Sequence, residues 1–239
     1  MGIFDVLVAI ILGIVEGITE WLPISSTGHM ILVNQFLTFS NDDFTQMFLV
    51  VVQLGAIMAV VLLFWKKIFP FNFQYKQNNK PFVKMDIMTL WFKILVATIP
   101  AAIVGVLFDD VQNPLSLRYE VLFVIYGILF IVVERWNKGR RPIITKVHDI
   151  TYQTAIIIGI FQLLAAIIPG TSRSGSTIIG GILVGTSRTV AAEFTFFLAI
   201  PVMFGASLLK LVKFGFTFTP AEVLTLVTGV VVAFFVSII

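Results

Sequence analysis

The sequence predicts an all-α integral membrane protein with inverted-topology repeats, each a re-entrant helix–loop–helix pair followed by transmembrane helices. Three observations predict this fold class. Charged residues make up only 12% of the 239 residues, whereas soluble domains contain about 25%. Long apolar runs recur along the whole chain. Two further apolar regions are interrupted at their centres by similar polar motifs, which is typical of repeated broken helices.

The composition limits the kind of protein this is. Hydrophobic residues account for 58% of the chain, and the mean hydropathy is +1.02, so lipid is the expected solvent for most of it. The length suits one membrane domain, 1–239, with no soluble domain beyond loops. Absence of cysteine excludes disulfides, thiolate nucleophiles and cysteine-based metal sites. No basic segment precedes Asp5, so no cleavable signal peptide is expected.

Apolar runs of helical length predict the membrane spans. The five predicted spans are 44–65, 94–108, 119–134, 190–213 and 221–239. The run 94–108 is short for a hydrocarbon core of about 30 Å, so we expect it to extend into Trp91–Lys93.

The charges of the loops predict the orientation. Loops 66–93 and 135–148 are rich in lysine and arginine, whereas 109–118 contains two aspartates. The positive-inside rule places the two basic loops in the cytoplasm and the N-terminus outside. Lys210 and Lys213 then fall outside, which counts mildly against this orientation.

Two apolar regions, 2–39 and 149–187, are broken at their centres by Pro23–Gly28 and Pro169–Gly175. Each half is too short to cross a bilayer, so both regions are predicted to be re-entrant pairs. Broken backbone at membrane depth is tolerated only inside protein or along a wet cavity.

The two regions are predicted to be copies of one another. The segment Gly13–Glu16 aligns with Gly159–Gln162, and Pro23 aligns with Pro169, both at an offset of 146 residues (159 − 13 and 169 − 23). The chain therefore divides into a first repeat, 1–135, and a second repeat, 149–239. Three spans separate the motifs, and this odd number inverts the second repeat. The second repeat has only two spans and reaches Ile239 inside an apolar run, so its final helix is expected to be absent.

The first motif contains two carboxylates in apolar sequence. Glu16 and Glu20 lie four residues apart, so a helix places them on one face. Burial and mutual repulsion of the two charges cost free energy, so a bound cation, an arginine or protonation of one carboxylate must offset that cost. A neutral hydrogen-bonded pair, or a solvated helix end, is the alternative.

The break that follows supplies hydroxyls and a histidine. Ser25, Ser26 and Thr27 precede His29. A hydroxyl here is either a nucleophile assisted by His29 or a helix cap. His29 is either a catalytic group or a satisfied buried imidazole.

The second motif is typical of an anion site. Small residues on either side of Arg173 let backbone N–H groups converge on an anion at a helix N-terminus. The guanidinium matches phosphate oxygens. The alternative is a capped break with Arg173 extending to the surface.

The natural ligand is phosphate, or diphosphate with a divalent cation, Mg or Ca, held by Glu16 and Glu20. Gln162 replaces Glu16 in the second copy, and this asymmetry favours an enzyme over a symmetric carrier.

Residues Glu16–His29 and Pro169–Gly175 closely resemble the two signatures of the undecaprenyl-diphosphatase family, also called the bacitracin-resistance family. The resemblance covers nearly the whole chain and departs only at the short C-terminus, where the family has one more helix. It implies hydrolysis of undecaprenyl diphosphate to undecaprenyl phosphate and inorganic phosphate, with a divalent cation. It also implies a multi-pass protein of the bacterial inner membrane, with the site open to the outer face. A polyprenyl diphosphate lipid is then the partner, no nucleic acid is expected, and a homodimer is left open.

The resemblance also implies roles for individual residues. Glu16 and Glu20 correspond to metal-coordinating or general-base carboxylates, and Arg173 stabilises charge on the transferred phosphoryl group. Ser26 corresponds to a nucleophile or phosphate ligand, and His29 to a nucleophile or general acid–base. The expected substrate-binding residues are Ser25, Thr27, Gly170, Thr171, Ser172, Ser174 and Thr177. The nucleophile stays open between Ser26, His29 and water, and a polyprenyl-phosphate transporter or flippase is the alternative function.

Overall fold

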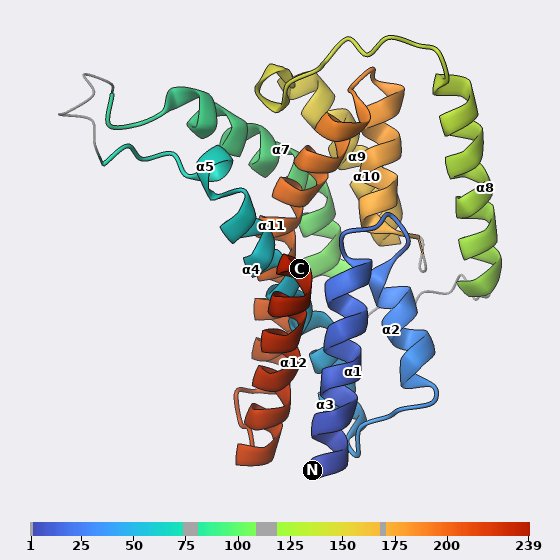
Figure 1. Cartoon of the computed structure of the whole chain (residues 1–239), viewed down its shortest axis with the longest axis vertical. Helices are drawn as coiled ribbons and strands as arrows, with labels where there is room; N and C mark the ends of the chain where they lie inside the picture. The colour runs from blue at the N-terminus through green and yellow to red at the C-terminus, as the bar shows by residue number, and fades with distance from the viewer. Residues whose placement is uncertain (1, 74–80, 109–118, 168–170) are drawn as a thin grey trace.

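The computed structural model describes residues 2–73, 81–108, 119–167 and 171–239, and in these residues the chain is helical (Figure 1). Outside the helices they contain only two isolated β-bridges. The helices are α1 (Ile3–Thr19), α2 (Ser26–Asn34), α3 (Asp42–Val51), α4 (Gln53–Leu63), α5 (Trp65–Ile68), α7 (Met85–Phe108), α8 (Tyr119–Asn137), η1 (Val147–Asp149), α9 (Tyr152–Ile167), α10 (Arg173–Leu183), α11 (Arg188–Phe214) and α12 (Pro220–Ile238).

Four segments in the described residues are long and apolar enough to cross a membrane. They are Asp42–Leu63, Met85–Gly105, Arg188–Phe214 and Pro220–Ile238. These segments confirm the prediction of an all-α membrane protein. The run predicted at 119–134 is helix α8, although the side chains of residues 119–123 lie outside the description.

Helix α7 begins earlier than predicted. The run 94–108 was expected to extend only into Trp91–Lys93, within a loop over 66–93, but the helix starts at Met85. The reason is a stripe of buried side chains at helical spacing, Ile87, Leu90 and Ile94, which packs into the core and makes helix more favourable than loop.

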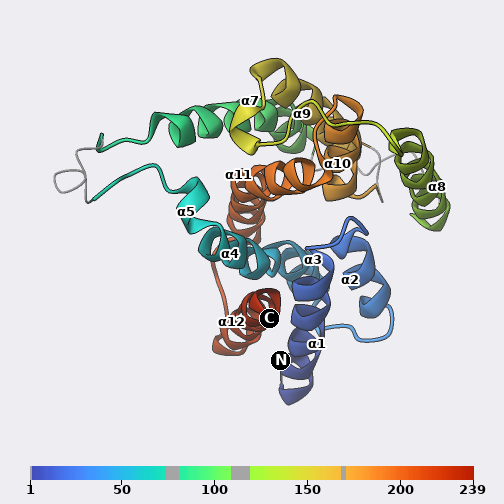
Figure 2. The same ribbon diagram turned by 45° about the horizontal axis from the view of Figure 1, so that its top comes forward.

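The helices that flank the two polar breaks are short. Helix α1 has 17 residues and α2 has nine, so they span about 26 and 14 Å. Helices α9 and α10 have 16 and 11 residues. None reaches the thickness of a hydrocarbon core, about 30 Å. Figures 1 and 2 show the α1–α2 turn next to the start of α10 in the middle of the molecule.

Glycines allow the closest helix contacts. Gly13 of α1 faces α12, where an added Cβ would lie 2.7 Å from the carbonyl oxygen of Gly229. Gly159 of α9 faces α7, where an added Cβ would lie 2.5 Å from the carbonyl oxygen of Ala97. Both distances are too short for any side chain, so the helices approach backbone to backbone. These two glycines are the aligned pair of the sequence repeat.

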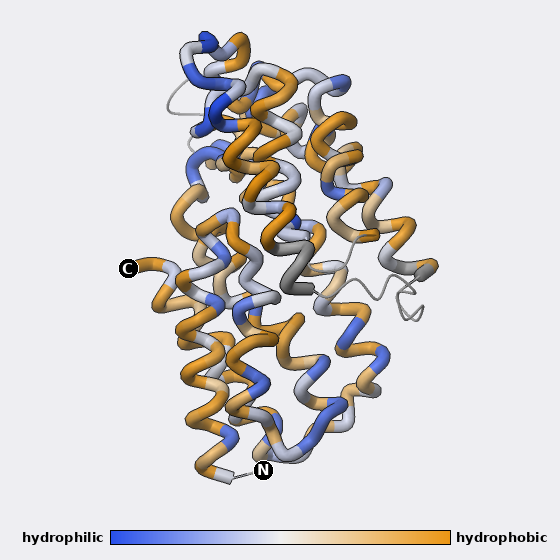
Figure 3. Tube along the Cα trace, turned by 90° about the vertical axis from the view of Figure 1, so that its right-hand side faces the viewer, coloured by the Kyte–Doolittle hydropathy of each residue, from blue (hydrophilic) through white to orange (hydrophobic). Residues whose placement is uncertain are grey.

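The most hydrophilic stretch of the chain lies at the end of the molecule opposite the N-terminus, and shorter polar segments interrupt the apolar helices elsewhere (Figure 3). At one end, Lys93 Nζ donates a hydrogen bond to the carbonyl oxygen of His148 at 3.1 Å, so the two basic segments predicted to share a side lie together. The N-terminus and the start of α12 lie at the other end (Figure 1).

Candidate active site

The turn between α1 and α2 is held in an unusual backbone conformation. Glu20 is the C-cap residue of α1, and Ser25 is the N-cap residue of α2. Ser25 has a φ of 65°, a left-handed value that is uncommon for a residue with a side chain. Its hydroxyl accepts a hydrogen bond from Gly28 N at 3.3 Å. Ser25 therefore closes the helix end, as expected for at least one of these hydroxyls.

Because Ser25 caps the helix, the hydroxyl of the next residue is free for another partner. Ser26 Oγ donates to Glu20 Oε2 at 2.6 Å, and both side chains are buried. A serine has a single O–H to donate, so its proton is directed at this carboxylate. Such a serine–base contact is the arrangement that activates a hydroxyl nucleophile.

The second motif uses the equivalent serine differently. Ser172 aligns with Ser26 at the offset of 146, but its hydroxyl is the N-cap of α10 and accepts from Gly175 N at 3.1 Å. The cap thus lies one position later in the second copy. The same residue type closes a helix in one motif and contacts a carboxylate in the other.

Arg173 joins the two motifs. Its Nη2 donates to Glu20 Oε1 at 2.5 Å, across 153 residues of sequence. Its Nε and Nη1 atoms are buried and have no hydrogen-bond partner. Leaving such donors unpaired costs free energy, so Arg173 is poised to bind further anionic oxygens.

A cavity of about 570 Å³ lies at this junction. Its wall combines residues of both motifs with apolar side chains of α2 and α11. The lining residues are Glu20, Ser25, Ser26, Thr27, Gly28, Ile31, Leu32, Gln35, Thr171, Ser172, Arg173, Ser174 and Met203. The cavity therefore combines hydroxyls, the Arg173–Glu20 ion pair and the N-terminus of α10 with an apolar wall, which suits an amphiphilic anion.

Glu16 is the most isolated carboxylate of the site. It is fully buried, its polar neighbours are Glu20, Ser26 and Arg173, and neither of its oxygens has a partner at hydrogen-bond geometry. A buried carboxylate without partners is unfavourable unless a cation or a proton joins it. The described residues contain no group of three or more His, Asp or Glu side chains placed to hold a metal, so Glu16 and Glu20 are the carboxylates available here.

Of the predicted residues that the structure describes, Glu16, His29 and Thr177 do not line the cavity. His29 is half-buried, and its Nδ1 lies 2.9 Å from the carbonyl oxygen of Ser25. Thr177 is fully buried and contacts the hydroxyl of Thr195 at 2.8 Å. Gly170 lies outside the described residues. Direct contact of His29 or Thr177 with a ligand would therefore need a rearrangement.

Gln53 was absent from the predicted site. It follows the break between α3 and α4 at Val52, and only 4% of it is exposed. Its Nε2 donates to Thr27 Oγ1 at 3.2 Å and to the carbonyl oxygen of Leu49 at 3.1 Å. The signal in the sequence was an amide inside an apolar run, which is costly in lipid and therefore typical of a functional position.

Comparison with known proteins agrees with this geometry. The family model described as "Bacitracin resistance protein BacA" matches residues 9–239. A protein of Desulfitobacterium hafniense named "Undecaprenyl-diphosphatase" is 60% identical over 100% of this chain and 86% of its own length. One of Enterococcus faecalis with the same name is 54% identical over 100% of this chain and 87% of its own length. The chain belongs to the bacitracin resistance protein BacA family.

Proposed function

We propose that this chain hydrolyses undecaprenyl diphosphate to undecaprenyl phosphate and inorganic phosphate, and so recycles a lipid carrier for cell-wall synthesis. The names of its relatives support this activity. The observation that carries the proposal is the position of Glu20, which accepts hydrogen bonds from both Ser26 and Arg173 in one cavity. The comparisons do not favour the alternative of a transporter or flippase.

In this proposal the diphosphate binds at the N-terminus of α10. Arg173 directs its two unpartnered nitrogens to phosphate oxygens, and Thr27 and Ser174 add hydroxyl groups from the cavity wall. The helix dipole favours an anion at this position. The prenyl chain leaves along the apolar wall that Ile31 and Leu32 form.

Ser26 is the proposed nucleophile. Its Oγ attacks the terminal phosphorus, its proton passes to Glu20, and the bond from that phosphorus to the bridging oxygen breaks to release undecaprenyl phosphate. Water then cleaves the phosphoserine and releases inorganic phosphate.

A divalent cation, Mg or Ca, would be held by Glu16 and Glu20. The buried, unpartnered oxygens of Glu16 fit such a ligand. Two carboxylates with substrate phosphate oxygens and water are a usual set for Mg²⁺. The cation supplies charge neutralisation for the transferred phosphoryl group.

The inverted-repeat architecture, 1–135 and 149–239 with re-entrant pairs at 2–39 and 149–187, is part of the proposal. It is supported by the reciprocal packing of α1 on α12 and of α9 on α7, through glycines aligned at the same offset. The shared end of the basic segments supports an orientation with the N-terminus outside and the site open to the outer face. The bacterial relatives support a place in the bacterial inner membrane. A homodimer is compatible with this arrangement.

Phosphate release in detergent tests the proposed activity. We expect the purified chain with Mg²⁺ to release inorganic phosphate from undecaprenyl diphosphate without a membrane, because hydrolysis needs no gradient. The measurement is phosphate formed over time, with the metal removed by chelator as the control. A chain that binds the lipid but releases no phosphate would support the carrier alternative.

Gln53→Leu is expected to raise the KM about fivefold with a smaller change in kcat. The amide occupies one lone pair of Thr27 Oγ1 and so leaves the Thr27 proton free to point into the cavity. One neutral hydrogen bond contributes about 1 kcal/mol, which is about fivefold in binding. Steady-state kinetics of the variant provide the measurement.

A double-mutant cycle with Thr27→Val is the control for the Gln53 prediction. If Gln53 acts through Thr27, its replacement causes no further loss when the hydroxyl is already absent. Independent, additive losses would show that Gln53 acts on something else.

A further inference from the structure

We propose that this protein carries a second lipid site, at its basic end, which binds a phospholipid with an anionic headgroup. The site is a groove between α4–α5, α7 and α11. It shares no lining residue with the candidate active site. The inference is independent of the proposed hydrolysis.

The groove has a volume of about 540 Å³ and an apolar wall. Its lining residues are Met58, Val61, Trp65, Ile68, Phe69, Pro70, Met88, Trp91, Leu95, Ile200 and Phe204. None of these side chains is charged, so the groove fits a hydrocarbon chain. Methionine and aromatic side chains adapt to flexible apolar ligands.

Helix α11 separates the groove from the active-site cavity. Ile200 and Phe204, four residues apart on one face of the helix, line the groove. Met203 lines the active-site cavity. A lipid in the groove therefore contacts the same turns of α11 that form a wall of the catalytic pocket, but it has no access to Arg173 or Ser26.

A cluster of aromatic rings borders the groove at the basic end. Phe71 and Val83 form an antiparallel bridge. The ring of Phe69 stacks on Trp65 with centroids 4.2 Å apart and lies 5.7 Å from Phe73, which is 75% exposed. Exposed aromatic rings beside an apolar surface are typical of the level of lipid headgroups. This aromatic cluster therefore marks where the headgroup of a bound lipid would lie.

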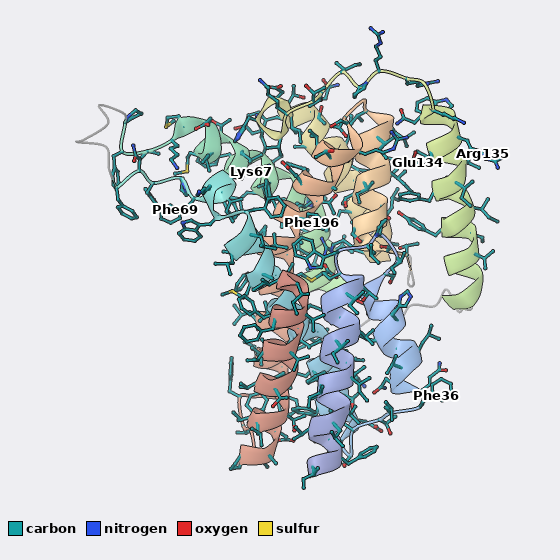
Figure 4. The ribbon with its side chains drawn as sticks, viewed as in Figure 1. Phe36, Lys67, Phe69, Glu134, Arg135 and Phe196 are labelled. Atoms are coloured by element: carbon teal, nitrogen blue, oxygen red, sulfur yellow. The ribbon has the colours of Figure 1, made fainter. Side chains whose placement is uncertain are left out.

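Lysines beside this aromatic cluster give the site its charge preference. Lys84 Nζ lies 3.5 Å from the carbonyl oxygen of the groove residue Phe69, and exposed Lys66 follows the groove residue Trp65. Lys67 is already paired with Glu193 at 2.6 Å, and Figure 4 shows Lys67 and Phe69 on this arm of the molecule.

These charges decide the occupant of the groove. Within the described residues 64–73 and 81–93, which form this arm, Asp86 is the one acidic residue. The charge next to the groove is therefore positive and attracts an anionic headgroup. A zwitterionic headgroup, which has no net charge, gains less electrostatic binding energy.

Quenching by brominated lipids tests the site. The chain has four tryptophans, so the variant Trp21→Phe/Trp136→Phe leaves only the groove residues Trp65 and Trp91 to fluoresce. In nanodiscs of phosphatidylcholine, dibrominated phosphatidylglycerol is expected to quench at an about 25-fold lower mole fraction than dibrominated phosphatidylcholine. Lys66→Gln and Lys84→Gln should each reduce this preference about fivefold, and together they should abolish it.

Arg141→Gln is the matched control, because it removes one positive charge from the exposed part of the other basic loop. It should leave the preference unchanged. Equal quenching by both lipids in the starting protein would overturn the proposal. A preference that survives replacement of both lysines would also overturn it. The same holds if Arg141→Gln lowers the preference as much as either lysine substitution does, since both results would mean general attraction to the charged surface.

Discussion

Replacing Arg173 by alanine is expected to lower phosphate release from undecaprenyl diphosphate by about a thousandfold or more. The change removes the cation of the cavity together with two unpartnered donors, Nε and Nη1. It also leaves Glu20 without its ion-pair partner, so two negative groups, the carboxylate and the phosphate, then repel each other. Initial rates in detergent with Mg²⁺ measure the effect.

Two further variants separate charge from geometry in this prediction. Arg173→Lys keeps the charge but loses the planar fork, so we expect an intermediate loss of about a hundredfold. Arg188→Ala is the matched control, because Arg188 pairs with Glu134 outside the described cavity wall and its side chain is 59% exposed. It should retain activity. Near-normal phosphate release by Arg173→Ala would contradict the proposed role.

Composition and periodicity made much of the fold predictable. The apolar runs indicated the membrane helices, and proline and glycine in the two breaks indicated where α1 and α9 end. The start of α7 at Met85 was missed, because charge near Lys84 and Asp86 suggested a loop. Burial of Ile87 and Leu90 against other helices stabilises the extra turns, and such tertiary packing overrides a local charge pattern.

The candidate site was only partly predictable, because its decisive contacts join distant segments. The motifs indicated that Glu20 and Arg173 matter, but their direct pairing depends on how α1 and α10 meet. Gln53 reaches Thr27 across 26 residues of sequence, and no local pattern encodes that contact. Ser25 and Ser26 are equally good cap residues, so only the left-handed backbone at Ser25 shows which hydroxyl is left free.

Ser26→Ala is expected to reduce phosphate release by at least about a thousandfold, because it removes the hydroxyl that donates to Glu20. This loss of phosphate release should exceed the loss caused by a substitution that removes only a helix-capping hydroxyl. Ser187→Ala is the control: Ser187 caps α11 by accepting from Val190 N at 3.3 Å and does not line the described cavity wall. It should cost about 1 kcal/mol of stability and leave the rate within about twofold.

Trapping the reaction with labelled undecaprenyl diphosphate then identifies the nucleophile. The proposed mechanism predicts an acid-stable phosphoenzyme that Ser26→Ala abolishes, because a phosphoserine ester survives acid. An acid-labile phosphoenzyme would assign the attack to His29 and would require its imidazole to leave the carbonyl oxygen of Ser25. Absence of any phosphoenzyme, together with a large loss in Ser26→Ala, would mean that Ser26 and Glu20 orient an attacking water, and the covalent step would have to be abandoned.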